Sequence, residues 1–142
     1  MKKFIAVVIA LSTLFGCATI MQSDSSVQPI EVFFTTALTD EGEPANQINQ
    51  ISITQGQVFI YVRWQMPRTQ HVQLTRIRDG AGRMVIERQD MFTPSEASAY
   101  PSTSVVYAFD KNADAAGLWA FEVYIDGEKM LEKTLNVVGP RN

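Results

Sequence analysis

Hydrophobic and polar residues alternate along most of the chain after about residue 30, and a period of two is typical of strands with one face in a core. Turn-forming pairs such as Gln55-Gly56 separate the alternating segments. We find no stretch in which apolar residues recur every three to four positions, as they do in an amphipathic helix. The pattern predicts seven or eight strands, over residues 30–37, 50–54, 57–64, 71–78, 83–90, 103–109, 118–125 and 129–138.

Three of these segments predict which side chains point into the core. One face of the 57–64 segment holds Val58, Ile60, Val62 and Trp64. Its other face is also largely apolar, which favours a strand in the middle of a sheet. The 118–125 segment places on one face Trp119, Phe121, Val123 and Ile125, and the last strand turns inward Leu131, Leu135 and Val137. We therefore expect both tryptophans to pack in the core rather than to form a sugar-stacking platform.

The sequence predicts two tight turns between neighbouring strands. The segment Asp79-Gly80-Ala81-Gly82 predicts a hairpin between residues 71–78 and 83–90, with the glycines adopting the positive φ angles that a tight turn requires. Asp126-Gly127 predicts a two-residue hairpin turn of type I′.

Short strands with close turns favour an antiparallel sandwich, because a parallel sheet needs long crossover connections. Residues 30–138 resemble the immunoglobulin-like and fibronectin-type sandwiches of bacterial envelope proteins, most clearly in the closing hairpin at residues 117–127 and 135–137. We predict a single all-β domain over residues 30–142, an immunoglobulin-like antiparallel β-sandwich. The resemblance by itself assigns no function.

The N-terminus has the order of an export signal, with Lys2 and Lys3 before an apolar stretch and small residues after it. Within it, Leu14-Phe15-Gly16-Cys17 resembles the lipobox of bacterial lipoproteins. That resemblance implies cleavage before Cys17, lipidation of its thiol and acylation of the new amine. We expect residues 1–16 to be a signal peptide and residues 17–29 to be a flexible tether behind the lipidated cysteine.

The residue after Cys17 bears on the destination of the protein. Among similar lipoproteins of Gram-negative bacteria, Asp at this position is associated with retention at the inner membrane, and here the residue is Ala18. We therefore expect a lipid anchor in the outer membrane, on the periplasmic face. The alternative is ordinary secretory cleavage after Ala18, which would leave a soluble periplasmic protein.

The composition of the chain argues against several kinds of partner and binding site. The chain has 12 Lys and Arg against 15 Asp and Glu, a formal net charge of −3, which disfavours nucleic acid as a partner. A single Cys excludes an internal disulfide framework, and a single His excludes most zinc sites. We predict no cofactor and no metal ion.

Three further groups of residues are candidates for catalysis or metal binding, and each also has a purely structural explanation. We expect His71, the only histidine, to be a partly exposed structural residue, because no nucleophile motif accompanies it. Glu122 and Glu132 could face each other across the last hairpin, either as a catalytic carboxylate pair or as ordinary surface acids. The start of a calcium loop is suggested by Asp110, Asn112 and Asp114, but the required Gly and Glu are missing further along.

Basic residues gather between positions 63 and 88, which hold six arginines and only two acids. If Arg78 faces Arg83 across the turn, Arg76 shares their face of the hairpin. Such a face is either a solvated surface or a binding site for anionic lipid, glycan or an acidic partner protein. We take Arg76, Arg78 and Arg83 as the candidate binding residues.

Together these observations favour an outer-membrane lipoprotein that acts without catalysis, as a binding or accessory subunit of the cell envelope. Two alternatives stay open, an envelope hydrolase or other enzyme and a purely structural envelope protein.

Overall fold

The computed structural model of the protein describes residues 26–140. Cys17, the predicted signal peptide and most of the predicted tether lie outside the described residues. Eight strands make up the described fold: β1 (Gln28–Thr35), β2 (Gln50–Ser52), β3 (Gln57–Gln65), β4 (His71–Arg78), β5 (Met84–Phe92), β6 (Ser102–Ala108), β7 (Gly117–Ile125) and β8 (Glu128–Val138). Each predicted strand begins and ends within two residues of one of these.

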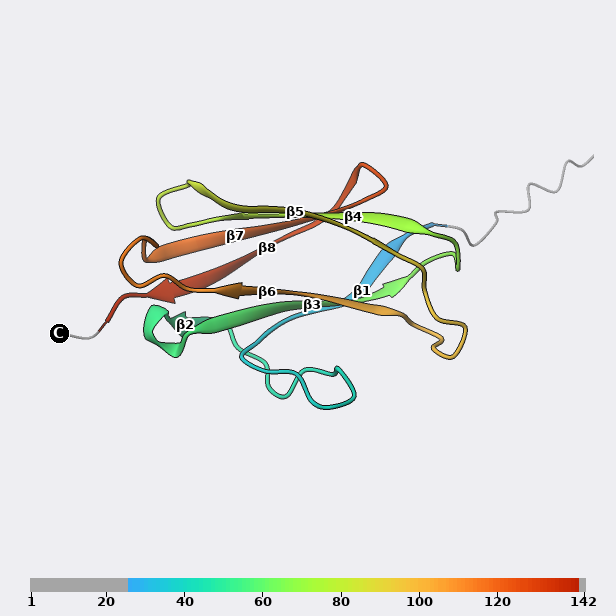
Figure 1. The fold of residues 1–142 in the computed structure, drawn as a ribbon, viewed down its shortest axis with the longest axis horizontal. Coiled ribbons are helices and arrows are strands. Elements are labelled where there is room, and N and C mark those ends of the chain that lie inside the picture. Colours follow the sequence, from blue (N-terminus) through green and yellow to red (C-terminus); the bar gives the residue numbers. More distant parts are fainter. Residues whose placement is uncertain (1–25, 141–142) are drawn as a thin grey trace, which may run out of the picture.

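The strands form two sheets that lie face to face (Figure 1). The smaller sheet has the order β1-β3-β6, and the larger has the order β2-β8-β7-β4-β5. Neighbouring strands are antiparallel except for the three-residue pairing of β2 with β8. The only helical element in the described part of the chain is a 3-10 turn, Ile53–Gln55. The architecture is an all-β sandwich, as the alternation predicts.

The core lies between the two sheets and is built from the predicted faces. Trp64 and Trp119 are both fully buried, which confirms the expectation that they pack in the core. The ring of Phe34 meets that of Phe121 edge-on, with centroids 4.8 Å apart. Leu135 from β8 is likewise fully buried. Side chains from the first, middle and last strands thus share one core.

The middle strand of the smaller sheet is covered on both sides. β3 lies between β1 and β6, as its two apolar faces predict. Its outer face is covered in part by the loop of residues 36–49, in which Glu43 accepts a hydrogen bond from the Tyr61 hydroxyl at 2.9 Å. The same carboxylate pairs with Arg63 at 2.7 Å. Tyr61 is consequently only 1% exposed although it points away from the core.

The two predicted turns differ in how they use glycine. Asp126 and Gly127 have φ angles of 52° and 85°, which fit the predicted type I′ turn. In the other turn only Gly82 has a positive φ, so the prediction is wrong for Gly80. Gly80 is needed for space instead, because a Cβ there would lie 2.1 Å from the carbonyl oxygen of Ala116.

The described chain starts and ends at opposite ends of the long axis (Figure 1). Ser26 and Val27 line the same hollow as Ile125 and Asp126, so the chain enters the domain beside the β7–β8 turn. β1 begins at Gln28, two residues earlier than predicted. The β4–β5 turn and the end of β8 lie at the far end. Within residues 26–140 no helix has the length and apolar character needed to cross a membrane.

Candidate functional site

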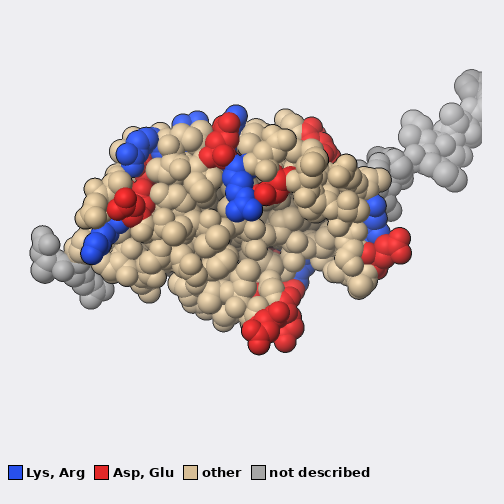
Figure 2. Space-filling model, viewed as in Figure 1, with Lys and Arg blue, Asp and Glu red and all other residues tan. Residues whose placement is uncertain are grey.

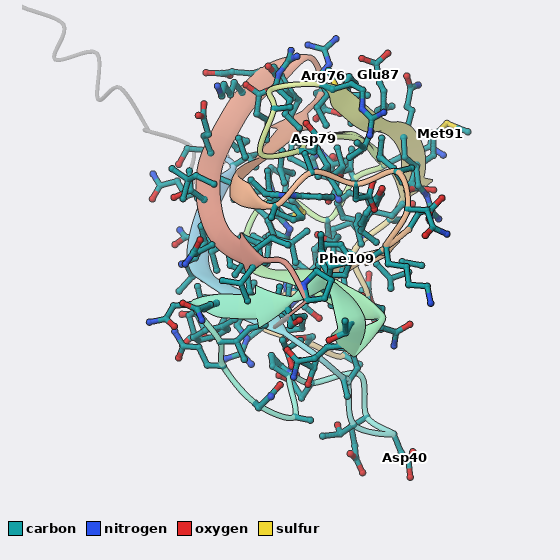
Figure 3. The ribbon with its side chains drawn as sticks, turned by 90° about the vertical axis from the view of Figure 1, so that its left-hand side faces the viewer. Asp40, Arg76, Asp79, Glu87, Met91 and Phe109 are labelled. Atoms are coloured by element: carbon teal, nitrogen blue, oxygen red, sulfur yellow. The ribbon has the colours of Figure 1, made fainter. Side chains whose placement is uncertain are left out.

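The candidate arginines lie on and beside β4, and the structure gives them different surroundings. Arg76 sits on the outer face of the larger sheet, where its Nε donates to Glu87 Oε2 at 2.7 Å. Its guanidinium also lies over the ring of Tyr124, 5.2 Å from the centroid. In Figure 3 Arg76 and Glu87 project outward at the top, whereas Asp79 lies beneath them. The charge of Arg76 is therefore paired within its own sheet.

Arg83 does not share the face of Arg76, so the predicted register is wrong. A β-bulge between Ile77 and Arg78 shifts the pairing of β4 with β5, and Arg78 lies opposite Met84 instead of Arg83. A one-residue shift moves a side chain to the other side of a hairpin. Arg78 stays two positions from Arg76 on the outer face and makes no ion pair with another described residue.

Arg83 instead holds two connections together. Its guanidinium lies 3.1 Å from the Asp79 carboxylate and donates to the carbonyl of Ala113 at 2.7 Å. Asp79 is 2% exposed. Burial alone would raise the pKa of its carboxyl, but the backbone N–H groups of Arg83 and Ala81 and the guanidinium charge lower it. Arg83 therefore ties the β4–β5 turn to the connection between β6 and β7.

The residues of the suggested calcium loop are used to build that same connection. The Tyr107 hydroxyl donates a bifurcated hydrogen bond to the two carboxylate oxygens of Asp114, at 2.8 and 2.9 Å, and the backbone N–H of Asp110 donates to the same carboxylate at 2.7 Å. Burial and the hydrogen bond to Asp114 raise the pKa of Tyr107. The carboxylate of Asp110 accepts the N–H of Asn112 at 2.9 Å. No cluster of three or more His, Cys, Asp or Glu side chains suited to a metal ion is found among the described residues.

His71 is 4% exposed, so the expectation of a partly exposed histidine is wrong. Its Nδ1 lies 2.7 Å from Asp126 Oδ2, and its Nε2 lies 2.8 Å from the carbonyl oxygen of Pro67. Because both partners are acceptors, the ring makes both hydrogen bonds only when both nitrogens carry protons. Burial works against the charged ring, but the bonds to Asp126 and Pro67 outweigh it and raise the pKa of His71.

The two acids of the last hairpin face each other as the sequence suggested. Glu122 and Glu132 lie opposite one another in the pairing of β7 with β8. The Lys129 ammonium lies between them and donates to both carboxylates, at 2.8 Å to Glu122. The hydrogen bond from Lys129 is the largest influence on Glu122 and lowers the pKa of its carboxyl. The pair is thus a shared ion pair on the outer sheet face.

A further cluster, which sequence reasoning missed, lies between the edges of the two sheets. A hollow of about 210 Å³ opens between β5 and β6, two strands that belong to different sheets. Its lining residues are Gln73, Arg88, Asp90, Phe92, Thr103 and Ser104. We call this hollow, together with its six lining residues, the lateral hollow. Gln73 is 4% exposed, and its Oε1 has no hydrogen-bond partner.

The sequence held a signal for this cluster. In the first part of β4 the buried positions hold polar residues, His71, Gln73 and Thr75, whereas Val72 and Leu74 face outward beside Arg76. The apolar Ile77 continues the inner face into the core. Burying a polar side chain costs free energy unless it is hydrogen-bonded, so this inverted alternation indicates that the three polar residues have polar partners or a polar space beside them. Figure 2, seen from the same side as Figure 1, shows basic and acidic side chains next to one another over the upper layer and a group of acidic side chains at the bottom.

Comparisons with known proteins bear on the fold. No protein-family model and no curated protein matches this chain. An immunoglobulin-like protein from Pseudomonas aeruginosa has a similar structure, with a TM-score of 0.51 and 13% identity over 82% of this chain and 99% of that one. The alkylpurine DNA glycosylase AlkC of Pseudomonas fluorescens, solved with DNA containing an abasic site analog, gives 0.51 and 11% over 80% of this chain and 31% of its own. The described chain therefore has an immunoglobulin-like fold.

Proposed function

We propose that this protein is a lipid-anchored domain of the bacterial outer membrane that serves, without catalysis, as a binding or accessory subunit of the cell envelope. The observation that carries the proposal is the lipobox-like segment Leu14-Phe15-Gly16-Cys17, and the chain's entry at the end that holds the β7–β8 turn supports it (Figure 1). Eight residues lie between Cys17 and Ser26, so even full extension gives a reach of only about 30 Å. A lipid on Cys17 would keep this end near the membrane and leave the sheet edges and the far end facing outward.

The surroundings of the catalytic candidates support a binding role over the alternative of an envelope hydrolase. A general base needs a ring nitrogen free to take a proton, and both nitrogens of His71 are held by Asp126 and Pro67. Glu122 and Glu132 share the Lys129 ammonium on an open sheet face. These side chains hold strands and turns in place.

The anchor is tested by comparing the wild type with Cys17→Ala, using mass spectrometry of the mature N-terminus and fractionation of the membranes. The expected result is an acylated Cys17 in the outer membrane for the wild type and no acylation in the variant. Ser26→Ala is the matched control and should behave as the wild type does. An unmodified chain beginning at Thr19 would contradict the proposal and indicate a soluble periplasmic protein.

The binding role is tested by placing a photocrosslinking residue at single exposed positions in intact cells. Met91 and Leu118 are suitable because they are 70% and 63% exposed on the larger sheet. Asp40, in the loop on the other side of the sandwich, is the control position (Figure 3). We expect one identified envelope component to be captured at a position on the larger sheet and not at Asp40. Capture of no component at any position would contradict a binding role.

A further inference from the structure

The lateral hollow has an internal wall that is polar and incompletely satisfied. The Gln73 Nε2 donates to Thr75 Oγ1 at 3.2 Å, which leaves the Oε1 as the only buried side-chain nitrogen or oxygen without a partner among the described residues. Leaving a buried amide oxygen unpaired costs about 1–3 kcal/mol. The Oε1 itself is fully buried, and Gln73 lines the hollow, so a turn of the side-chain amide toward the hollow would let a bound hydrogen-bond donor remove this penalty.

The charges at the opening of the hollow cancel each other. Arg88 Nε lies 2.8 Å from one Asp90 carboxylate oxygen, and both Nε and Nη2 donate to the other at 3.1 Å. A neutral pair offers neither the excess positive charge that an anion needs nor the free carboxylates that a cation needs. An apolar occupant would shield this pair from water and leave the Gln73 oxygen without a partner. The chemistry that fits is a neutral molecule with several hydroxyl or amide donors.

The volume of the lateral hollow also favours a small polar molecule. A volume of about 210 Å³ is below the 300–1,000 Å³ typical of sites for drug-sized ligands, so the hollow fits one small ring. Phe92 provides an apolar wall, and Thr103 and Ser104 of β6 line the side opposite Gln73, where the Thr103 hydroxyl also accepts the indole N–H of Trp64 at 2.9 Å. An aromatic wall combined with convergent hydrogen-bonding groups suits a sugar ring, which has apolar C–H faces and a polar rim.

A second hollow continues the first one. It has a volume of about 440 Å³ and shares Phe92 and Thr103 with the lateral hollow. Its other lining residues are mostly hydroxyl-bearing or proline residues of the β5–β6 connection, together with Glu41 and Glu43. A linear chain of sugars seated in the lateral hollow could therefore extend past Phe92 along this connection.

We propose that the lateral hollow is a saccharide-binding site that takes one sugar unit of a neutral glycan chain, with Gln73 Oε1 accepting a hydrogen bond from a hydroxyl or N-acetyl N–H group of the sugar. The site is separate from the outer face that carries Arg76 and Arg78. The proposal deepens the binding role proposed above and rests on it, but it does not depend on the lipid anchor.

The test uses the full-length protein, isotope-labelled and purified in detergent, and follows its amide signals by NMR during titration. The probes are the tetramer of β-1,4-linked N-acetylglucosamine, maltotetraose and triglycine. We expect at least one saccharide to shift the side-chain amide of Gln73 and the backbone amides of Thr103 and Ser104. Triglycine should leave these signals in place.

Two variants and one control assign the binding to the site. Arg88→Gln removes one partner of the neutral pair from the exposed rim and should weaken saccharide binding by about tenfold or more. Gln73→Met keeps the side-chain volume but removes the acceptor, and it should have a similar effect. The control is Lys129→Gln, which breaks a lysine–carboxylate pair on the outer face of the same sheet and should leave the affinity unchanged.

Several results would overturn the proposal. It fails if no saccharide moves the signals of Gln73, Thr103 and Ser104. It also fails if triglycine alone moves them, since the site would then bind peptide. Equal affinity of the wild type and Arg88→Gln would place the binding elsewhere. None of these results bears on lipidation of Cys17, so the two proposals can fail separately.

Discussion

The contact between His71 and Asp126 makes a prediction about how stability changes with pH. The contact joins the start of β4 to the β7–β8 turn, where Asp126 Oδ1 also accepts the N–H of Val72 at 2.9 Å. The substitution that tests it is Asp126→Asn. Asn tolerates the positive φ of this turn position, and its side-chain oxygen can still accept the Val72 N–H. The amide can no longer accept a charged ring at His71.

The direction of the effect follows from the two pKa shifts. The pKa of His71 is raised from its ordinary 6.5, so its contribution to stability is fully present below about pH 6.5 and is lost as the pH rises through the folded-state pKa. The pKa of Asp126 is lowered from 3.8, mainly by the N–H of Val72 and then by His71, so its contribution is present above about pH 3.8 and is lost as the pH falls further. The pair should therefore stabilise the protein most between these two values.

The size of the effect can be worked out from the geometry. A hydrogen bond between charged groups contributes about 1.5–3 kcal/mol when it is shielded from water. The side chain of Asp126 is 50% exposed, so solvent screening reduces this to about 1–1.5 kcal/mol. For a domain of this size that corresponds to roughly 3–6 °C in Tm.

The assay is urea unfolding of the wild type, Asp126→Asn and the control Asp40→Asn at about pH 5.5 and about pH 8.5. Because His71 is the only histidine, few other groups titrate in this interval. The wild type and the control should lose about 1–1.5 kcal/mol of unfolding free energy on going to the higher pH, and Asp126→Asn should lose little. Equal pH dependence in all three proteins would refute a protonated His71 in the folded state.

Three further predictions concern stability and are measured by the same urea unfolding. Gly80→Ala should destabilise the protein by about 3 kcal/mol, because the added Cβ would lie 2.1 Å from a backbone oxygen, and wild-type stability would contradict this close approach. Trp119→Ala should cost about 3–5 kcal/mol, since the side chain is fully buried, and a loss below about 1 kcal/mol would mean that the indole is not part of the core. Arg83→Gln should cost about 1–2 kcal/mol by weakening the contact with buried Asp79, whereas Arg78→Gln should change stability by less than about 0.5 kcal/mol; equal effects would contradict the separate surroundings of the two arginines.

The sequence determined the strands and much of the fold. Alternation is a local property, set by the geometry of an extended chain, so the segment at residues 71–78 could be delimited without knowing its neighbours. The type I′ turn at Asp126-Gly127 is local in the same sense. The inward faces of β3 and β7 could also be assigned, because only a core accommodates that many large apolar side chains.

Tertiary structure decided which polar side chains meet. The arginine face depended on the register of β4 against β5, and a single bulge after Ile77 moved Arg83 away from Arg76 and toward Asp79. The burial of His71 depended on Asp126, 55 residues further along the chain. Local patterns carry no information about such pairings, because a one-residue change in register reverses every side chain of a strand.

The lateral hollow is the clearest example of a feature that local sequence patterns cannot predict. Gln73 and Ser104 lie in different sheets, and their positions around one space depend on how those sheets stack. The sequence indicated only that β4 has polar residues where a core strand would have apolar ones. Which groups from the opposite sheet face them follows from the packing of the whole sandwich, since that packing alone sets the distance between β5 and β6.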